Sequence, residues 1–277
     1  ARGDSIMTGL YGVIGDPIAH SLSPLIHNEW LREHDIDATY KAMQVPAGEL
    51  EEALATLTRQ GARGLNITLP HKQAALALAE EQGDLARRIG AANTLVRAES
   101  GGWHAENTDA PGFIHTLDKA GVDVAGKNVF LLGAGGSARA LAVVLTDLGA
   151  DLTICNRTIS RAQEIADNLL TKPEVCTLDV GLERLATAEL VVNTVSLGHS
   201  GQALELPKGT GKTFYDISYG KAAAPTIAHA KAQDWRTMDG LGMLVAQAAF
   251  AFELWFGIVP DMEAAETRCR AIVEATT

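Results

Sequence analysis

The segment between residues 133 and 138 has the residue types that bind a dinucleotide. Gly133, Ala134, Gly135, Gly136, Ser137 and Ala138 directly follow the apolar run 129–132 and precede a helical pattern over 139–148. In a dinucleotide-binding fold the first glycine permits a tight turn, the second lets the backbone approach a pyrophosphate, and a small third residue lets the helix pack on its strand. The N–H groups at the start of the helix then bind phosphate. A purely structural strand-to-helix turn is the alternative for this segment.

The end of the next predicted strand, 151–155, indicates which dinucleotide would bind. This strand runs into Asn156, Arg157 and Thr158, about twenty residues past the glycines, where NAD enzymes carry a carboxylate for the ribose hydroxyls. Arg157 and Thr158, with Arg161 one helical turn further on, offer guanidinium and hydroxyl groups to a 2'-phosphate instead. The sequence therefore favours NADP over NAD. The alternative is an exposed arginine beside a Thr158 N-cap.

Two serines in the loop after the predicted strand 10–15 could bind an anion. Ser23 stands directly before Pro24, which predicts Ser23 as the N-cap of a helix that begins with proline. That structural role leaves Ser21 unexplained. Both hydroxyl groups could donate hydrogen bonds to a substrate carboxylate.

A second group of polar side chains follows the predicted strand 64–68. Asn66 and Thr68 occupy alternate positions, so their side chains are expected to point the same way, and Lys72 comes just past the strand end. Asn93 and the turn 107–109 add further amide, hydroxyl and carboxylate groups. Each of these segments by itself is also compatible with ordinary turn and capping chemistry.

Taken together and in this order, the segments resemble the shikimate dehydrogenase family, from Tyr11 to Gly257. Two departures from the family pattern are His71, where an apolar or aromatic residue is common, and Ser137, where alanine is usual. The resemblance rests on the serine loop, the lysine strand, the turn 107–109, the glycine loop, the segment 156–158, and the segments 193–198, 216–219, 239–240 and 243–249.

The resemblance implies an NADP-dependent oxidoreductase that reversibly reduces 3-dehydroshikimate to shikimate in aromatic amino acid biosynthesis. It implies that Lys72 and Asp109 are the catalytic pair. The implied substrate-binding residues are Ser21, Ser23, Asn66, Thr68, Asn93, Tyr219 and Gln247. The implied cofactor-binding residues are those of the glycine loop, Asn156, Arg157, Thr158, Arg161, Thr194, Val195, Gly240 and Met243; no metal ion is expected.

The chemistry of alcohol oxidation explains these residue types. Hydride leaves for the nicotinamide while the hydroxyl proton goes to a positioned base, and Lys72 is the candidate acid/base. A lysine shielded from water gives up its proton more readily, whereas the carboxylate of Asp109 would hold that proton. The sequence leaves the balance between these two effects open.

The apolar segment 241–256 predicts a helix that carries part of the site. Leu244, Ala248, Phe252 and Trp255 recur at helical spacing and predict a core stripe, whereas Gly240, Met243 and Gln247 share another face. Gln247 is expected to donate into a pocket. Met243 would lie against the nicotinamide by family resemblance, with plain packing as the alternative.

The elements around these residues predict a two-domain α/β fold. A length of 277 residues with 47% apolar and 21% charged residues allows two cores. Strand-like and helix-like segments alternate through most of the chain. We expect an N-terminal α/β substrate domain over 7–109, a Rossmann-like NADP-binding domain over 110–240, and C-terminal helices over 241–277 that return to the first domain.

Composition limits the partners and the compartment. The net charge of −11 argues against nucleic acid or an anionic membrane as a partner, and no apolar run is long enough to span a bilayer. Three widely spaced cysteines fit neither a disulfide framework nor a zinc site, so a cytoplasmic protein is expected. Residues 1–6 lack the apolar core of a signal peptide, and Met7 is the expected natural start. The expected assembly is a monomer or a homodimer.

Two other functions are compatible with the same residues. One is a quinate/shikimate dehydrogenase of broader substrate range, against which the paired serines and the segment 156–158 argue. The other is a catalytically silent NADP-binding sensor, against which the presence of both Lys72 and Asp109 argues. Glutamyl-tRNA reductase and methylene-tetrahydrofolate dehydrogenase share a similar cofactor domain but lack the serine loop joined to the lysine strand.

Overall fold

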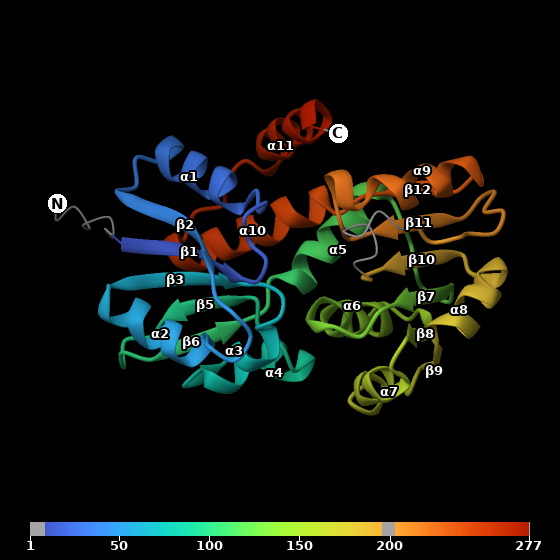
Figure 1. Ribbon diagram of the computed structural model, residues 1–277, viewed down its shortest axis with the longest axis horizontal. Coiled ribbons are helices and arrows are strands. Elements are labelled where there is room, and N and C mark those ends of the chain that lie inside the picture. The colour runs from blue at the N-terminus through green and yellow to red at the C-terminus, as the bar shows by residue number, and fades with distance from the viewer. Residues whose placement is uncertain (1–8, 196–202, 277) are drawn as a thin grey trace. The chain divides into compact units, whose positions relative to one another are not determined.

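The chain forms two compact units, each built on its own sheet. A computed structural model describes residues 9–195 and 203–276. The first unit takes the chain up to Thr108 and again Gln247–Ala265, and the second takes Asp109–Ala246 and Glu266–Thr277. Figure 1 shows the two sheets with their helices. The two-domain α/β fold predicted from the sequence is confirmed, whereas the predicted domain boundaries stay a prediction.

The sheet of the first unit is mixed. Its six strands lie in the order β2-β1-β3-β5-β6-β4. β2, β1 and β3 pair in parallel, β5 runs antiparallel to both β3 and β6, and β4 joins β6 in parallel. The strands are β1 Gly9–Gly15, β2 Ala38–Gln44, β3 Ala62–Ile67, β4 Glu81–Gln82, β5 Thr94–Arg97 and β6 Trp103–Glu106, and the helices are α1 Ser23–Glu33, α2 Leu50–Arg59, α3 Lys72–Leu78 and α4 Asp84–Ile89.

The second half of helix α10, Leu241–Phe256, packs on this first sheet. The ring of Trp255 lies 5.2 Å from that of Tyr11, and its indole N–H donates to the Leu95 carbonyl at 3.1 Å. A Cβ at Gly64 would overlap the Trp255 indole, so glycine is required for this close approach. The later part of the chain therefore completes the core of the first unit.

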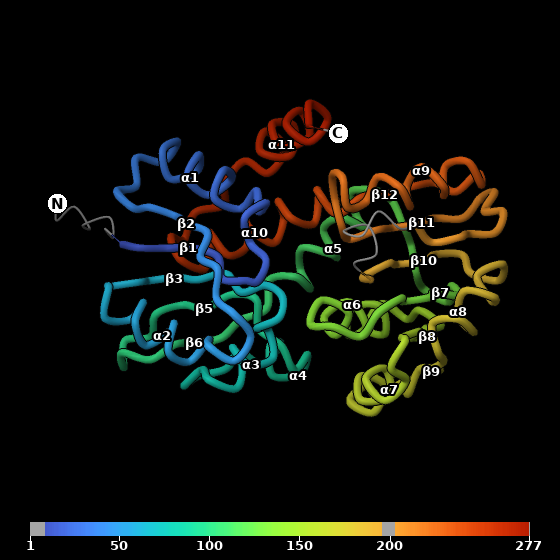
Figure 2. Tube along the Cα trace, in the orientation of Figure 1, coloured from blue at the N-terminus to red at the C-terminus, as the bar shows by residue number. Residues whose placement is uncertain are grey.

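The sheet of the second unit is entirely parallel. Its order is β12-β11-β10-β7-β8-β9, which is the Rossmann order, with β7 as the first strand of the fold. Figure 2 traces how the chain returns to the centre of this sheet between β9 and β10. The strands are β7 Asn128–Leu132, β8 Asp151–Asn156, β9 Glu174–Thr177, β10 Leu190–Asn193, β11 Thr213–Asp216 and β12 Arg236–Met238, and the helices are α5 Asp109–Ala120, α6 Gly136–Asp147, α7 Ile159–Asp167, α8 Leu178–Arg184, α9 Ala224–Ala232 and α11 Met262–Thr276.

The order of this sheet locates the nucleotide site. In open parallel sheets a ligand binds at the carboxyl ends of the strands where the strand order reverses, which here is between β7 and β10. The glycine loop follows β7, and Thr194 follows β10. Both therefore lie at the expected binding edge.

The predicted helix over 241–256 is confirmed, whereas its predicted core stripe is only partly correct. Ala248, Phe252 and Trp255 are buried, but Leu244 is only half-buried and Val245 beside it is buried. The helix is buried on more than one face because few of its residues are polar. Among the described residues, no helix is both long and apolar enough to cross a membrane.

Candidate active site

Gly133 makes the turn that the sequence predicted for the cofactor loop. Its φ of +113° is a conformation that other residues rarely adopt. Its N–H donates to the Cys155 carbonyl at 2.7 Å, and a Cβ there would overlap the Thr194 hydroxyl. The loop is therefore held between β8 and β10, and only glycine fits its first position.

The residues after this turn suit a phosphate. A Cβ at Gly135 would meet no described atom within 4 Å, so the space beside its backbone is open. The ladder of α6 starts with the hydrogen bond from Arg139 N–H to the Gly135 carbonyl, and the preceding N–H groups point out of the helix end. Ala138 is fully buried, as a small third position requires. Ala134, Gly136 and Ser137 are half-buried.

The segment predicted to bind the 2'-phosphate lies at the end of β8. Asn156 ends the strand and donates from Nδ2 to the Thr158 carbonyl at 2.8 Å, which closes the turn. Arg157, Thr158 and Arg161 are exposed, and the two arginines form no ion pair within the described residues. Thr158 occupies the N-cap position of α7, but its side chain makes no capping hydrogen bond. These exposed cationic and hydroxyl groups can meet an anion.

Two buried polar residues that received no role in the sequence analysis hold the loops at the other strand ends. Asn193 accepts a hydrogen bond from Val195 N–H at 3.1 Å and donates to Asp216 at 3.0 Å. Asp216 also accepts from Ser218 N–H at 2.9 Å. Burial raises the pKa of the Asp216 carboxyl, and the hydrogen bonds from Ser218 and Asn193 oppose that rise. Both residues lie in segments on which the family resemblance rests, but the sequence does not show that their side chains are buried.

The remaining cofactor candidates lie on this same framework. Thr194 donates its hydroxyl proton to the Leu132 carbonyl at 2.7 Å. Gly240 N–H donates to the Ser218 carbonyl at 2.8 Å, and a Cβ there would overlap the carbonyl of Ile217. Met243 is buried at 6% exposure, and Tyr219 is half-buried. The predicted cofactor-binding residues of the second unit thus lie at the carboxyl ends of β7, β8, β10 and β12, in the loops and helix starts that follow these strands, and Tyr219 follows β11.

The serine loop of the first unit corrects one prediction. Ser23 is the first residue of α1 rather than its N-cap, a position that Leu22 takes. The Ser21 oxygen instead accepts the N–H of Ser23 at 3.2 Å. Ser21 therefore does the capping predicted for Ser23, and its hydroxyl proton stays available to donate elsewhere. Ser23 is buried, and Ser21 is half-buried.

Three predicted substrate-binding residues meet in one buried network. Asn66 donates from Nδ2 to the Asn93 carbonyl at 3.3 Å, and Asn93 donates from Nδ2 to Gln247 Oε1 at 3.3 Å. The Asn93 oxygen accepts the N–H of Thr108 at 2.7 Å. The network therefore joins β3, the residue that precedes β5, and α10, and it fixes the backbone one residue before Asp109.

Lys72 and His71 have different surroundings. The His71 side chain is 2% exposed, and its Nε2 lies 2.6 Å from the Val45 carbonyl, to which it donates. Lys72, the first residue of α3, is half-buried. Thr68 is also half-buried just past β3. The His71 ring is committed to a structural hydrogen bond, so it is poorly placed to act as a base instead of its neighbour Lys72.

Asp109 begins α5 and is 5% exposed. It belongs to the second unit, whereas Lys72 belongs to the first. A carboxylate in the first turn of a helix is stabilised by the N–H groups there. The two residues of the proposed catalytic pair thus come from the starts of two helices.

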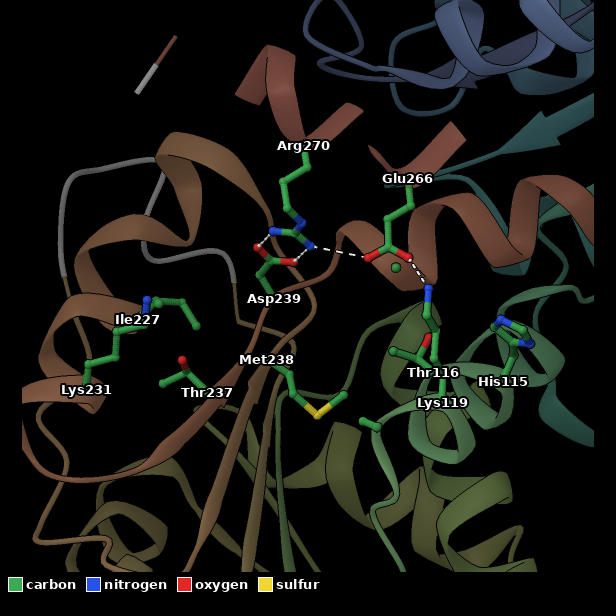
Figure 3. A pocket seen from close by; sticks show the side chains of 12 residues that line it. His115, Thr116, Lys119, Ile227, Lys231, Thr237, Met238, Asp239, Glu266 and Arg270 are labelled. Atoms are coloured by element: carbon green, nitrogen blue, oxygen red, sulfur yellow. Dashed lines mark hydrogen bonds and ion pairs between the residues drawn. The ribbon is translucent and has the colours of Figure 1, made fainter. Parts of the chain in front are cut away.

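A separate pocket of the second unit contains none of the predicted site residues. It has a volume of about 390 Å³, and its wall carries a connected set of ion pairs (Figure 3). Arg270 pairs with Asp239 at 2.8 Å and reaches Glu266 at 3.5 Å, while Lys119 pairs with Glu266 at 2.9 Å. The charges of these residues neutralise one another. The exposed arginines at the end of β8, by contrast, form no ion pair within the described residues.

Three family models together match most of the chain. The shikimate dehydrogenase substrate binding domain matches residues 13–95, shikimate / quinate 5-dehydrogenase matches 116–242, and the shikimate 5'-dehydrogenase C-terminal domain matches 240–268.

Whole proteins match equally well. A shikimate dehydrogenase (NADP(+)) of Hyphomonas neptunium is 60% identical over 98% of this chain and 100% of its own length. One of Acidiphilium cryptum is 40% identical over 95% of both chains.

Solved structures have the same fold. Shikimate 5-dehydrogenase of Thermus thermophilus, in complex with NADP(H) and shikimate, is 34% identical with a TM-score of 0.83 and covers 95% of this chain and 99% of its own. Shikimate dehydrogenase of Aquifex aeolicus is 32% identical with a TM-score of 0.86, over 95% of this chain and 98% of its own. The chain therefore belongs to the shikimate dehydrogenase family.

Proposed function

We propose that this protein is an NADP-dependent shikimate dehydrogenase that reversibly reduces 3-dehydroshikimate to shikimate, a step of aromatic amino acid biosynthesis. One observation carries the proposal most directly. The second unit has a sheet in the Rossmann strand order and a glycine turn at Gly133. In the first unit, hydrogen bonds join Asn66, Asn93 and Gln247. The first feature suits a dinucleotide, and the second suits a polyhydroxylated ring.

The residues of the second unit fit NADP. Gly133 lets the loop make a tight turn, and the open space beside the Gly135 backbone admits a pyrophosphate. The first residues of α6 offer N–H groups to it. Arg157 and Arg161 supply charge for a 2'-phosphate. When bound, the cofactor accepts or returns the hydride.

Lys72 acts as the acid/base, and Asp109 orients the reacting groups. During oxidation of the alcohol, Nζ of Lys72 accepts the hydroxyl proton, and during reduction it returns that proton to the carbonyl oxygen. The Asp109 carboxylate accepts hydrogen bonds and so holds an ammonium or hydroxyl group in a fixed direction. His71 takes no part, because its ring is buried and bonded to Val45.

The polar residues of the first unit bind the substrate. Ser21 and Ser23 donate to the carboxylate, which a chain of net charge −11 must attract through local donors. The network of Asn66, Asn93 and Gln247 faces the ring hydroxyls. Thr68 and, from the second unit, Tyr219 complete the proposed set.

Further properties follow from the same assignment. We place the enzyme in the cytoplasm as a monomer or a homodimer, with only small molecules as partners and no nucleic acid. A quinate/shikimate dehydrogenase of broader range is the second candidate function, because one of the matching family models covers both substrates. A silent NADP-binding sensor is the third.

One assay separates these candidates. Purified protein is given shikimate or quinate with NADP or NAD, and formation of the reduced cofactor is followed by its absorbance. The proposal predicts the highest kcat/KM with shikimate and NADP. Comparable turnover of quinate would favour the broader enzyme, and NADP binding without turnover would favour the sensor.

A further inference from the structure

Tyr40 on β2 carries a buried hydroxyl group that has no role in the site described above. The residue is 2% exposed, and its hydroxyl donates to Asn66 Oδ1 at 2.7 Å. Asn66 is a proposed substrate-binding residue. A buried tyrosine hydroxyl bonded to a ligand-binding carboxamide can control which way that carboxamide points.

The hydrogen bonds of Asn66 fix what it can offer to a substrate. A carboxamide has two N–H donors and an oxygen with two lone pairs. Asn66 Nδ2 donates to the Asn93 carbonyl at 3.3 Å and to the Thr94 hydroxyl at 3.2 Å, and Oδ1 accepts from Tyr40. Both donors are therefore committed, so the side chain can meet a substrate only through its oxygen. In this orientation Asn66 accepts a hydrogen bond from a substrate hydroxyl.

The surroundings of Tyr40 hold its ring and backbone in place. His27 stacks on the ring at a centroid distance of 4.2 Å with the two planes 10° apart. Asn28 donates to the Tyr40 carbonyl at 2.9 Å and accepts the Tyr40 N–H at 3.0 Å. Both partners lie on α1, so Tyr40 links the helix that begins at Ser23 to the strand that carries Asn66.

The charge states of this group are settled by burial. Burial raises the pKa of the Tyr40 phenol well above its ordinary value, and a hydrogen bond with the Ser23 side chain opposes that rise. Burial lowers the pKa of His27 to about 3. The phenol therefore keeps its proton, which it needs as a donor, and the imidazole against it stays neutral.

We propose that Tyr40 is a positioning residue for this reaction, which holds the Asn66 carboxamide with its oxygen toward Tyr40 so that Asn66 meets a substrate hydroxyl as an acceptor. The inference rests on the proposed function, since it needs Asn66 to bind substrate. It adds a residue to which neither the family resemblance nor the comparisons assign a role.

The substitution Tyr40→Phe tests the inference with little change in packing. Loss of the hydroxyl releases the carboxamide, so the KM for shikimate should rise by about threefold to tenfold, as expected for one neutral hydrogen bond. The kcat should change by less than about twofold, and the KM for NADP should stay constant. A purely structural role would instead lower stability and leave the two Michaelis constants equally affected.

Tyr11→Phe is the matched control. Tyr11 pairs with Tyr40 across the neighbouring strand and is equally buried, but its hydroxyl has no hydrogen-bond partner among the described residues. Its removal should leave the KM for shikimate unchanged. Equal effects of Tyr11→Phe and Tyr40→Phe would overturn the inference.

A double-mutant cycle shows whether Tyr40 acts through Asn66. In an Asn66→Ala background, at least half of the increase in log KM caused by Tyr40→Phe should disappear. If the fold increases in KM caused by the two substitutions multiply in the double variant, Tyr40 does not act through Asn66 and the inference is wrong. If Asn66→Ala by itself leaves KM unchanged, the proposed substrate role of Asn66 fails, and the inference fails with it. If Asn66→Ala raises KM but Tyr40→Phe does not, the inference alone is overturned.

Discussion

At the scale of single residues, Ser21 has a structural role and a proposed binding role. Its oxygen accepts the N–H of Ser23, which fixes the hydroxyl over the first turn of α1. In the proposed function, this hydroxyl also donates a hydrogen bond to the substrate carboxylate. Ser21→Ala should raise the KM for shikimate more than it lowers kcat, because a hydrogen bond to a charged group contributes about 1.5 to 3 kcal/mol.

Steady-state kinetics with Ser100→Ala as the control measures this effect, since Ser100 is exposed in a turn and bonds Glu80. A collapse of kcat at constant KM would mean that Ser21 takes part in the chemical step. The sequence predicted the hydroxyl pair but assigned the cap to Ser23, because a capping contact from two residues earlier depends on a backbone turn that residue types do not specify.

Arg157 should determine the choice of cofactor. It is exposed at the end of β8, and the chain has no carboxylate at this position to repel a 2'-phosphate. Arg157→Asp should therefore weaken NADP binding by much more than NAD binding. Dissociation constants for both cofactors measure the difference, with the exposed Arg59→Asp of the first unit as the control. If the two cofactors lose affinity equally, the 2'-phosphate lies elsewhere.

At the scale of elements, the turn after β7 contains two glycines with different requirements. Gly133 is needed for its backbone conformation, and Gly135 for the open space beside it. Gly133 has φ +113° and touches Thr194, whereas Gly135 has φ −86° and open space beside it. Gly133→Ala should lower the free energy of unfolding by about 1 to 3 kcal/mol and weaken NADP binding. Gly135→Ala should weaken NADP binding while stability stays nearly constant.

Urea unfolding and NADP titration of both variants check this difference. Equal stability of the two variants would contradict the assigned conformation of Gly133. This turn is also an element that the sequence predicts. The turn was predictable because its glycines follow an apolar strand and precede a helix.

Other elements could not be predicted because their sequences carry little local signal. β4 has two residues, β12 has three, and α4 has six, too few to show a period. The antiparallel course of β5 against β3 and β6 depends on pairing between distant segments. Burial of Asn193 and Asp216 has the same origin, since it results from the loops packed over the strand ends.

At the scale of the whole molecule, His27 makes stability depend on pH. Burial lowers its pKa to about 3, whereas in the unfolded chain a histidine titrates near 6.5. Below that pH the unfolded state takes up a proton that the folded state does not. The free energy of unfolding is therefore not reduced by His27 above about pH 6.5. It falls by about 1.4 kcal/mol per pH unit as the pH is lowered from there toward 3.

Urea unfolding at pH 7, 6 and 5 should show a shallower loss of stability for His27→Phe than for the unchanged protein. Phenylalanine keeps the ring against Tyr40 but cannot bind the proton. The exposed His20→Gln serves as the control and should keep the original slope. An unchanged slope in His27→Phe would mean that another group controls acid unfolding.

The division of the chain into two units gives the central claim its most direct test. Lys72 belongs to the first unit, whereas the glycine loop and Arg157 belong to the second, so the proton transfer and cofactor binding can be separated. The measurement is kcat for Lys72→Ala beside the dissociation constant for NADP, with His71→Ala as the matched control. We predict that kcat falls by about 100-fold to 10,000-fold, that NADP binding stays nearly unchanged, and that His71→Ala is mild by comparison. Near-normal turnover in Lys72→Ala together with an inactive His71→Ala would contradict the mechanism and reduce Lys72 to a binding or structural residue.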